Sequence, residues 1–398
     1  MKNKFDYFKT ALESRLKQNH YRQLRCTAPL DEVHLINREK RMINFTTNDF
    51  LGISSHPFIK KNTVDTALKW GAGSTPSRLL TPHLTAFEKC EKRLAELIKT
   101  EEALLFCSDF QLPHALISAL CNPKTVIYID RSCRPQLMQS SLTSSARVVR
   151  FEHNDIGHLK RCLERDEEGG AQVKVIITES LFHVDGSLSP LWDLAELAHA
   201  HSALFVVDDS LTSGVMGQNG MGRGAHQLGI DILLGTFNKV CGVVSSFLGT
   251  SSLMKNYLLE ISEEFSGRTV LPPAVLGSVE AMMQLIPDME TEREALTRKC
   301  TKLRNDLKKI GFVVGESASH IVHLHIGDDH KAGELFETLR QEGIYTTLIK
   351  APLVPVNAAR IRLAISHDHT DDQLSRLLLT LQNLQHTARP IQSMTVSH

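Results

Sequence analysis

The sequence predicts an α/β fold in which a large domain with a mostly parallel sheet precedes a smaller C-terminal α/β domain. Short β-branched runs alternate with helix-like stretches from residue 103 onward, a pattern typical of a parallel sheet covered by helices on both faces. After the Pro-Pro pair at 272–273, one long charged helix leads into a new set of strands and helices. A chain of 398 residues is long enough for two or three domains.

The chain begins with a segment that predicts a helical arm over residues 1–44. Its first 25 residues carry charges throughout and contain no continuous apolar core, which indicates an amphipathic helix and not a signal peptide. No apolar run elsewhere approaches membrane-spanning length. We therefore expect a cytoplasmic protein that makes no membrane contact.

The large domain is expected over residues 45–286. Its strands are predicted at residues 103–106, 125–130, 173–180, 203–209, 231–236 and 245–250. Glu179, Asp208 and Thr236 stand where three of these strands stop. Since ligands in open α/β sheets bind beyond the carboxyl ends of the strands, these side chains mark a candidate site.

The small domain is expected over residues 287–398. A charged helix that ends at Gly311 opens it. Strands and helices then alternate, at residues 320–326, 331–343, 360–365 and in the last part of the chain.

Two short motifs have structural interpretations. GMGRG at 220–224 does not lie between a strand and a helix, so we interpret it as a turn and not as a dinucleotide site. The HDH triplet at 367–369 is followed by Thr370-x-x-Gln373, which has the form of a helix capping box. Its histidines are therefore expected in a solvated loop, with no metal bound.

Composition argues against several classes of partner. The 45 basic and 45 acidic residues give a formal net charge of zero, so nothing directs the chain to nucleic acid or to an anionic membrane. The eight cysteines are scattered without a Cys-x-x-Cys motif. This spacing argues against a disulfide framework or a zinc site.

One lysine stands in a run of apolar and small residues. Lys239 lies within GTFNKVCGVV at 235–244, between two predicted strands, where an ammonium group would lose hydration. A lysine in such a run most often extends to water. However, Asp208 ends a hydrophobic strand about thirty residues earlier. A desolvated amine and a carboxylate that keeps a pyridine nitrogen protonated are what pyridoxal 5'-phosphate (PLP) requires.

Eight segments in order strengthen this interpretation. They are NFTTNDFLG (44–52), GAGSTPSRLL (71–80), FEHNDIGHLKRCL (151–163), ITESLFHVDGSLSPL (177–191), VVDDSLTSGVMGQNGMGRG (206–224), GTFNK (235–239), FSGRTVLPPAV (265–275) and ARIRLAISHDHT (359–370). With them the chain resembles, over nearly its whole length, the α-oxoamine synthase family of fold-type-I PLP enzymes. The resemblance implies a fold-type-I PLP-dependent transferase that forms a homodimer.

The resemblance implies a role for each matching residue at the cofactor. Lys239 would bind the aldehyde carbon of PLP, and Asp208 would bind the pyridine nitrogen. Thr236 would reach the phosphate, as would Thr269 from the other subunit. The family's phosphate segment reads Ser108-Asp109-Phe110 in this chain, with a carboxylate where the family has glycine.

Further cofactor positions depart from the family. Arg134 stands where the family stacks an imidazole on the PLP ring, and Leu211 stands where a histidine bonds the phenolic oxygen. His183 replaces a serine near the cofactor, and Asn238 replaces the glycine before the lysine. We expect His183 to supply the hydrogen bond that Leu211 cannot make, and Arg134 to lay its guanidinium plane over the ring.

Substrate roles follow from the same match. Asn48 and Arg362 would hold the carboxylate of the amino acid, for which an arginine fork is suited. Arg22 would approach the acyl group. Leu353 stands where a threonine of the family contacts the substrate.

The implied activity is decarboxylative condensation of an amino acid, alanine in the nearest match, with an acyl-CoA or acyl-carrier-protein thioester. If the acyl group is pimeloyl, the pathway is biotin synthesis. One alternative is a sister activity that uses glycine or serine with another acyl-CoA. Another is a non-catalytic member that keeps the dimeric fold for binding or regulation.

Overall fold

The structure, a computed structural model, describes residues 3–17, 24–74, 77–166, 170–262, 270–315, 317 and 319–387. Contacts divide the chain into two units. The larger comprises Asn48–Lys299 with Glu316–His320, and the smaller comprises Met1–Thr47, Cys300–Gly315 and Ile321–His398. The expected domain boundaries after residues 44 and 286 stay a prediction.

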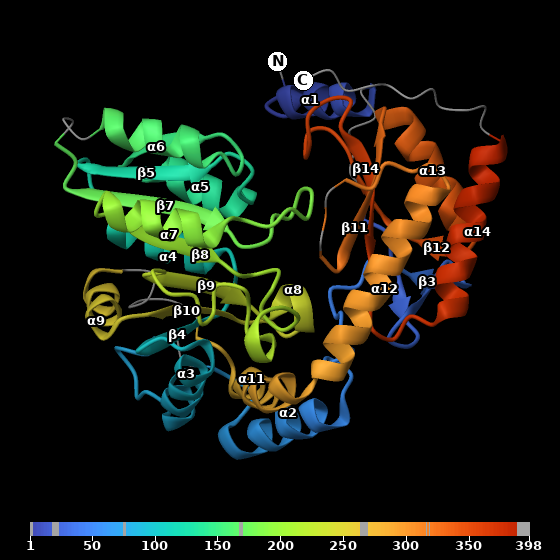
Figure 1. The fold of residues 1–398 in the computed structure, drawn as a ribbon. Coiled ribbons are helices and arrows are strands. Elements are labelled where there is room, and N and C mark those ends of the chain that lie inside the picture. The colour runs from blue at the N-terminus through green and yellow to red at the C-terminus, as the bar shows by residue number, and fades with distance from the viewer. Residues whose placement is uncertain are drawn as a thin grey trace. The chain divides into compact units, whose positions relative to one another are not determined.

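A seven-stranded sheet forms the centre of the larger unit (Figure 1). Its strands lie in the order β4 (Glu102–Phe106), β10 (Ser246–Thr250), β9 (Ile232–Thr236), β8 (Leu204–Asp208), β7 (Val173–Glu179), β5 (Thr125–Asp130) and β6 (Arg147–Phe151). The strands from β9 to β6 run parallel, and β10 is antiparallel to both β9 and β4. The prediction of an α/β fold with a mostly parallel sheet is confirmed.

The central strands are covered on both faces. Every residue of β5, β9 and β10 is buried, as expected for near-continuous apolar runs in a covered sheet. Neighbouring strands contribute Leu248, Leu234, Val206, Ile177 and Ile127 to one core. Helices flank the sheet in Figure 1, namely α4 (Gln111–Leu120), α5 (Pro135–Thr143), α6 (Ile156–Arg165) and α7 (Leu191–Ala200).

The larger unit also contains a closely packed helix pair, α2 (Pro57–Trp70) and α11 (Pro273–Leu285). Gly277 permits the close approach, because a Cβ atom there would lie 2.3 Å from Thr66 Oγ1. Its other helices are α3 (Thr85–Ile98), the short α8 (Asn238–Cys241) and α9 (Ser252–Ile261). The long charged helix of the prediction is α12 (Glu290–Lys309).

The smaller unit contains two sheets. One has the order β1 (Ala28–Pro29), β2 (His34–Asn37), β3 (Lys40–Asn44) and β12 (Ile344–Tyr345). The other has the order β11 (Ile321–Gly327), β14 (Ala359–Ala364) and β13 (Thr347–Ile349). Its helices include α1 (Asp6–Lys17), α13 (Asp329–Gln341) and α14 (Asp371–Thr387).

His369 corrects one expectation from the sequence. Its side chain is fully buried, its Nδ1 accepts a hydrogen bond from the backbone N–H of Ser366 at 2.9 Å, and its ring stacks on Phe45 at 4.5 Å. The expectation of a solvated loop is therefore wrong for His369, which is a core residue held by a hydrogen bond and a ring contact.

The described residues contain neither a membrane-spanning helix nor a cluster of metal ligands. No helix in the described part of the chain is long and apolar enough to cross a membrane. Over the described ranges, no group of three or more His, Cys, Asp or Glu side chains could hold a metal ion.

Candidate functional site

Three polar side chains stand at the carboxyl ends of adjacent parallel strands. β7 ends at Glu179, β8 at Asp208 and β9 at Thr236. Glu179 and Asp208 are register partners, and all three residues are buried. These three residues, which the sequence predicts at the ends of strands, therefore lie together at one edge of the sheet. This is the location where open α/β sheets bind ligands.

Asp208 provides a buried carboxylate with two hydrogen-bond donors. Its Oδ1 accepts from the backbone N–H of Ser210 at 2.8 Å, and its Oδ2 accepts from Nε of Arg134. Burial alone raises the pKa of a carboxyl group, but the charges of Arg134 and Lys239 hold the pKa of Asp208 below its ordinary value. The carboxylate is therefore ionised at neutral pH.

Arg134 connects several parts of this edge. It precedes α5, whose first helical residue is a proline, and its backbone N–H donates to the carboxylate of Glu179. The side chain is only 3% exposed, and its Nη1 donates to the backbone oxygen of Asp109 at 3.1 Å. Although burial disfavours a charged guanidinium, Asp208 and Glu179 raise the pKa of Arg134, so the cation persists.

Lys239 lies in α8, the short helix between β9 and β10. Its neighbours Val240 and Cys241 are buried, yet its own side chain remains about one-fifth exposed and its Nζ lies 3.0 Å from Asp109 Oδ2. The amine thus neither extends freely to water nor lies in purely apolar surroundings, because a carboxylate contacts it.

The start of α4 resembles an anion site. Ser108 precedes this helix, and its Oγ accepts from the backbone N–H of Gln111 at 3.1 Å. The backbone N–H groups of Asp109 and Phe110 form no hydrogen bond to another described residue. Unpaired N–H groups at a helix start, together with the helix dipole, favour phosphate.

Buried hydroxyl groups lie at the same edge of the sheet. Thr236 Oγ1 donates to the backbone oxygen of Ser245 at 2.7 Å and accepts from Asn238 N–H at 3.2 Å. The Oγ atoms of Ser245 and Ser246 are buried without a hydrogen-bond partner among the described residues. Since Ser246 is in register with both Thr236 and Phe106, these hydroxyls lie near the chain segment that leads into α4.

His183 and Leu211 belong to the predicted cofactor set. His183 Nδ1 lies 3.3 Å from Glu179 Oε1, and the side chain is about one-third exposed. Leu211 is buried and carries no polar group. That His183 supplies the hydrogen bond missing at Leu211 stays a prediction.

These residues fit PLP. An ionised, buried carboxylate suits a protonated pyridine nitrogen, and the amine of Lys239 is close enough to lower that carboxylate's pKa. The start of α4 and the unpartnered hydroxyls of Ser245 and Ser246 provide donors for a phosphate. Asp109 opposes this fit, since its negative charge lies beside the start of α4.

The residues assigned to the substrate fall in different places. Asn48 belongs to the larger unit, and Arg362 and Leu353 to the smaller. Arg362 is half-buried in β14, and burial lowers its pKa, whereas Leu353 is exposed. Arg22 and Thr269 lie outside the described residues.

Asp209 shapes the site, although no role was predicted for it from the sequence. It is buried, and its carboxylate accepts from Gly224 N–H at 2.6 Å and from Thr212 Oγ1 at 2.9 Å. Burial raises its pKa despite these bonds. The carboxylate holds the glycine-rich turn at 217–224 close to the end of β8. In the sequence, the pair Asp208-Asp209 at the end of this strand could have indicated its role.

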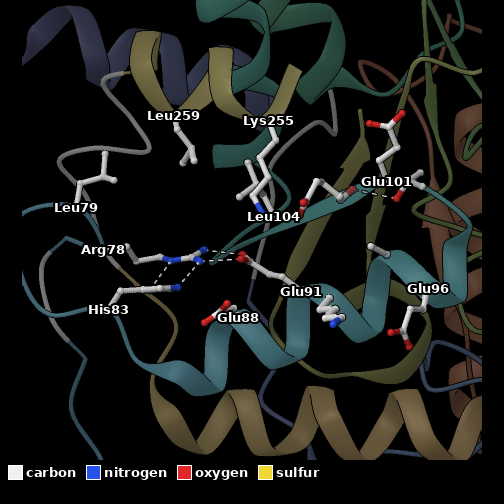
Figure 2. Close-up of a pocket in the computed structure, with 14 residues that line it drawn as sticks. Arg78, Leu79, His83, Glu88, Glu91, Glu96, Glu101, Leu104, Lys255 and Leu259 are labelled. Carbon is white, nitrogen blue, oxygen red and sulfur yellow. Dashed lines mark hydrogen bonds and ion pairs between the residues drawn. The ribbon is translucent and has the colours of Figure 1, made fainter. Parts of the chain in front are cut away.

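A cavity of about 550 Å³ lies elsewhere in the larger unit, beside α3, β4 and α9. Figure 2 shows that the guanidinium of Arg78 faces the carboxylate of Glu91, and two of their N–O distances are 2.6 and 2.8 Å. Lys255 Nζ lies 2.6 Å from Glu102 Oε2. The described residues that line this cavity do not include Glu179, Asp208 or Thr236. The cavity is therefore separate from the site at the carboxyl ends of the strands.

Two relatives of similar sequence carry the same description. A putative 8-amino-7-oxononanoate synthase from Desulfosudis oleivorans is 35% identical over 94% of this chain and 97% of that protein. An 8-amino-7-oxononanoate synthase from Gluconacetobacter diazotrophicus is 32% identical over 96% of this chain and 97% of that protein.

Solved structures show the same fold at lower identity. Serine palmitoyltransferase from Sphingomonas wittichii has a TM-score of 0.89 at 22% identity and covers 97% of this chain and 98% of its own. An 8-amino-7-oxononanoate synthase from Francisella tularensis has a TM-score of 0.75 at 22% identity, with 87% of this chain and 98% of its own covered.

A family match covers most of the chain. Residues 40–381 match the family described as aminotransferase class I and II. The relatives above align over nearly their full length at more than 30% identity. The chain therefore belongs to the aminotransferase class I and II family and has the fold-type-I architecture of its PLP-dependent enzymes.

Proposed function

We propose that the protein is a PLP-dependent C-acyltransferase of the 8-amino-7-oxononanoate synthase type. It joins the Cα atom of an amino acid, alanine, to the acyl carbon of a pimeloyl thioester. The C–S bond of the thioester and the bond from Cα to the carboxylate break, so the products are an α-amino ketone, CO2 and a free thiol. The observation that carries the proposal is the grouping of Asp208 and Lys239 in a chain 35% identical to a protein of that description.

PLP, when bound, supplies a ring that accepts the electron pair released at Cα. Asp208 holds the proton on the pyridine nitrogen, for which its buried and ionised carboxylate is suited. Nζ of Lys239 takes the proton from Cα, as a positioned amine does in general base catalysis. Donors at the start of α4 bind the phosphate, and Thr236 reaches it when its hydroxyl turns away from the backbone oxygen of Ser245.

The substrate groups are assigned from the resemblance to the family. Arg362 and Asn48 bind the carboxylate of the amino acid, and the burial of Arg362 strengthens its attraction to an anion. Arg22 binds the acyl substrate, and Leu353 presents an apolar surface to it. The thioester carrier is coenzyme A or an acyl-carrier protein.

The assembly that this function requires is a homodimer in the cytoplasm. Thr269 of the partner subunit completes the phosphate site, so each site contains residues from two chains. The proposed oligomer is closed and two-fold symmetric.

Turnover assays test the function directly. Purified protein with PLP is mixed with alanine, glycine or serine and with pimeloyl-CoA or pimeloyl-acyl-carrier protein, and thiol and CO2 release are measured. Alanine with a pimeloyl thioester should turn over, and Lys239→Ala should abolish it. Preference for glycine or serine would favour a sister activity, and absence of turnover with every pair would favour a non-catalytic member of the family.

A further inference from the structure

Arg134 is the partner of Asp208 in a continuous charge chain. Its Nε contacts Asp208 Oδ2, its Nη1 lies 3.5 Å from Asp109 Oδ2, and Asp109 in turn contacts Lys239 at 3.0 Å. Negative and positive groups therefore alternate along four side chains. Each charge has an opposite neighbour supplied by the protein itself.

Both oxygens of Asp208 have a protein donor. Oδ1 accepts from Ser210 N–H, and Oδ2 accepts from Arg134. The arginine is fixed by burial and by its position at the start of α5. A ring nitrogen that binds Asp208 has to share Oδ2 with Arg134 or take its place.

We propose that Arg134 is a positioning residue that holds the Asp208 carboxylate and competes with the pyridine nitrogen of PLP for it, which weakens cofactor binding. The proposal rests on PLP binding at this site. A guanidinium is always charged and binds carboxylates strongly in buried geometry. A protonated ring therefore meets a carboxylate that a fixed cation already neutralises.

The test compares two substitutions of Arg134 in the full-length protein. Arg134→Gln removes the charge, and Arg134→Lys keeps it. Arg131→Gln is the matched control, because Arg131 is exposed and pairs with Glu152 outside the charge chain. PLP is removed by dialysis, and its dissociation constant is then measured for each variant by fluorescence titration at one pH.

We expect Arg134→Gln to bind PLP about tenfold tighter than the wild type, the change that follows when a competing buried partner is lost. Arg134→Lys should stay within about threefold of the wild type, and Arg131→Gln should not change. Equal or weaker binding by Arg134→Gln would overturn the proposal. So would equal tightening by Arg134→Lys.

A second measurement tests the proposal if Arg134→Gln folds poorly. Its melting temperature without PLP should fall, and adding Asp208→Asn should restore part of the loss, because the double variant no longer buries an unpaired charge. Asp208→Asn should also remove the effect of Arg134→Gln on PLP affinity. A double variant less stable than Arg134→Gln would reject the pairing.

Failure of the proposed function has a different signature. The wild type and the variants could show the predicted order of PLP affinities while the wild type transfers no acyl group. That result would refute the acyltransferase and leave the role of Arg134 intact. A protein in which neither the wild type nor Arg134→Gln binds PLP would refute both.

Discussion

At the scale of single residues, the contact between Lys239 and Asp109 determines the environment of the amine. Lys239 was expected to lose hydration in an apolar run, and Val240 and Cys241, which follow it in α8, are buried. The structure adds a carboxylate 3.0 Å from Nζ. The cofactor aldehyde therefore has to compete with Asp109 for this nitrogen.

The first prediction concerns Lys239 itself. Lys239→Ala should remove the cofactor that borohydride attaches covalently to the protein, because the modified amine is absent, while the melting temperature should change little. Peptide mass spectrometry after reduction locates the attachment. A reduced cofactor on another lysine would refute the assignment of Lys239.

The second prediction concerns His153. Its Nδ1 lies 3.1 Å from Asp130 Oδ1 and its Nε2 lies 2.9 Å from Ser187 Oγ. Burial alone lowers the pKa of this imidazole, but the bond and charge of Asp130 raise it above its ordinary value. A raised pKa in the folded state contributes stability below the unfolded pKa, and this is lost as pH rises through the folded pKa.

His153→Gln should therefore lower the free energy of unfolding by about 1–2 kcal/mol at pH 5.5 and by less at pH 8.5. Urea denaturation at the two pH values measures the difference. His201→Gln, at the end of α7, is the control. An equal loss at both pH values would mean that the imidazole is neutral throughout.

Residue chemistry was only partly predictable from the sequence. The positions of Asp208 and Lys239 relative to the strands could be predicted from the sequence, whereas their roles at the cofactor stay predictions. The contact between Arg134 and Asp208 could not be predicted, because the two residues are 74 positions apart in the chain. A side chain's contact across that separation depends on packing that no local pattern contains.

At the scale of elements, the predicted strands were found because their apolar runs are buried on both faces. β6 was missed because its sequence, RVVRF, includes two exposed arginines, Arg147 and Arg150, and only Phe151 is buried, as is usual at a sheet edge. The capping box before α14 was predicted correctly, since Thr370 N–H donates to Gln373 Oε1 at 2.8 Å. Local signals were therefore reliable where local bonds decide the structure.

The third prediction concerns the turn that Asp209 holds. Gly222 has φ +112°, and a Cβ atom there would lie 2.3 Å from Asp209 Oδ2. Gly222→Ala should lower the free energy of unfolding by about 1–3 kcal/mol, because it combines backbone strain with a clash.

Gly333→Ala is the matched control in α13, where a Cβ atom meets nothing within 4 Å. It should stabilise the protein by about 0.5–1 kcal/mol, the usual preference for alanine in a helix. Urea denaturation of both variants measures the contrast. A neutral Gly222→Ala would show that the turn relaxes without loss.

At the scale of the whole molecule, the fourth prediction is the homodimer. Thr269 is assigned to the phosphate site of the other subunit, so the protein should sediment as a dimer. Thr269→Ala should weaken PLP binding without dissociating the dimer. Analytical ultracentrifugation with a PLP titration checks both. A monomer that binds PLP tightly would contradict the assignment.

The adjacent aspartates at the end of β8 make this strand sensitive to a change in its length. Asp208 bonds Arg134 and Asp209 bonds the turn at 217–224, since successive side chains of an extended segment point to opposite sides. Insertion or deletion of one residue within β8 would reverse that alternation and exchange the two carboxylates. An insertion or deletion in this strand would therefore disable the cofactor site and the turn in a single event.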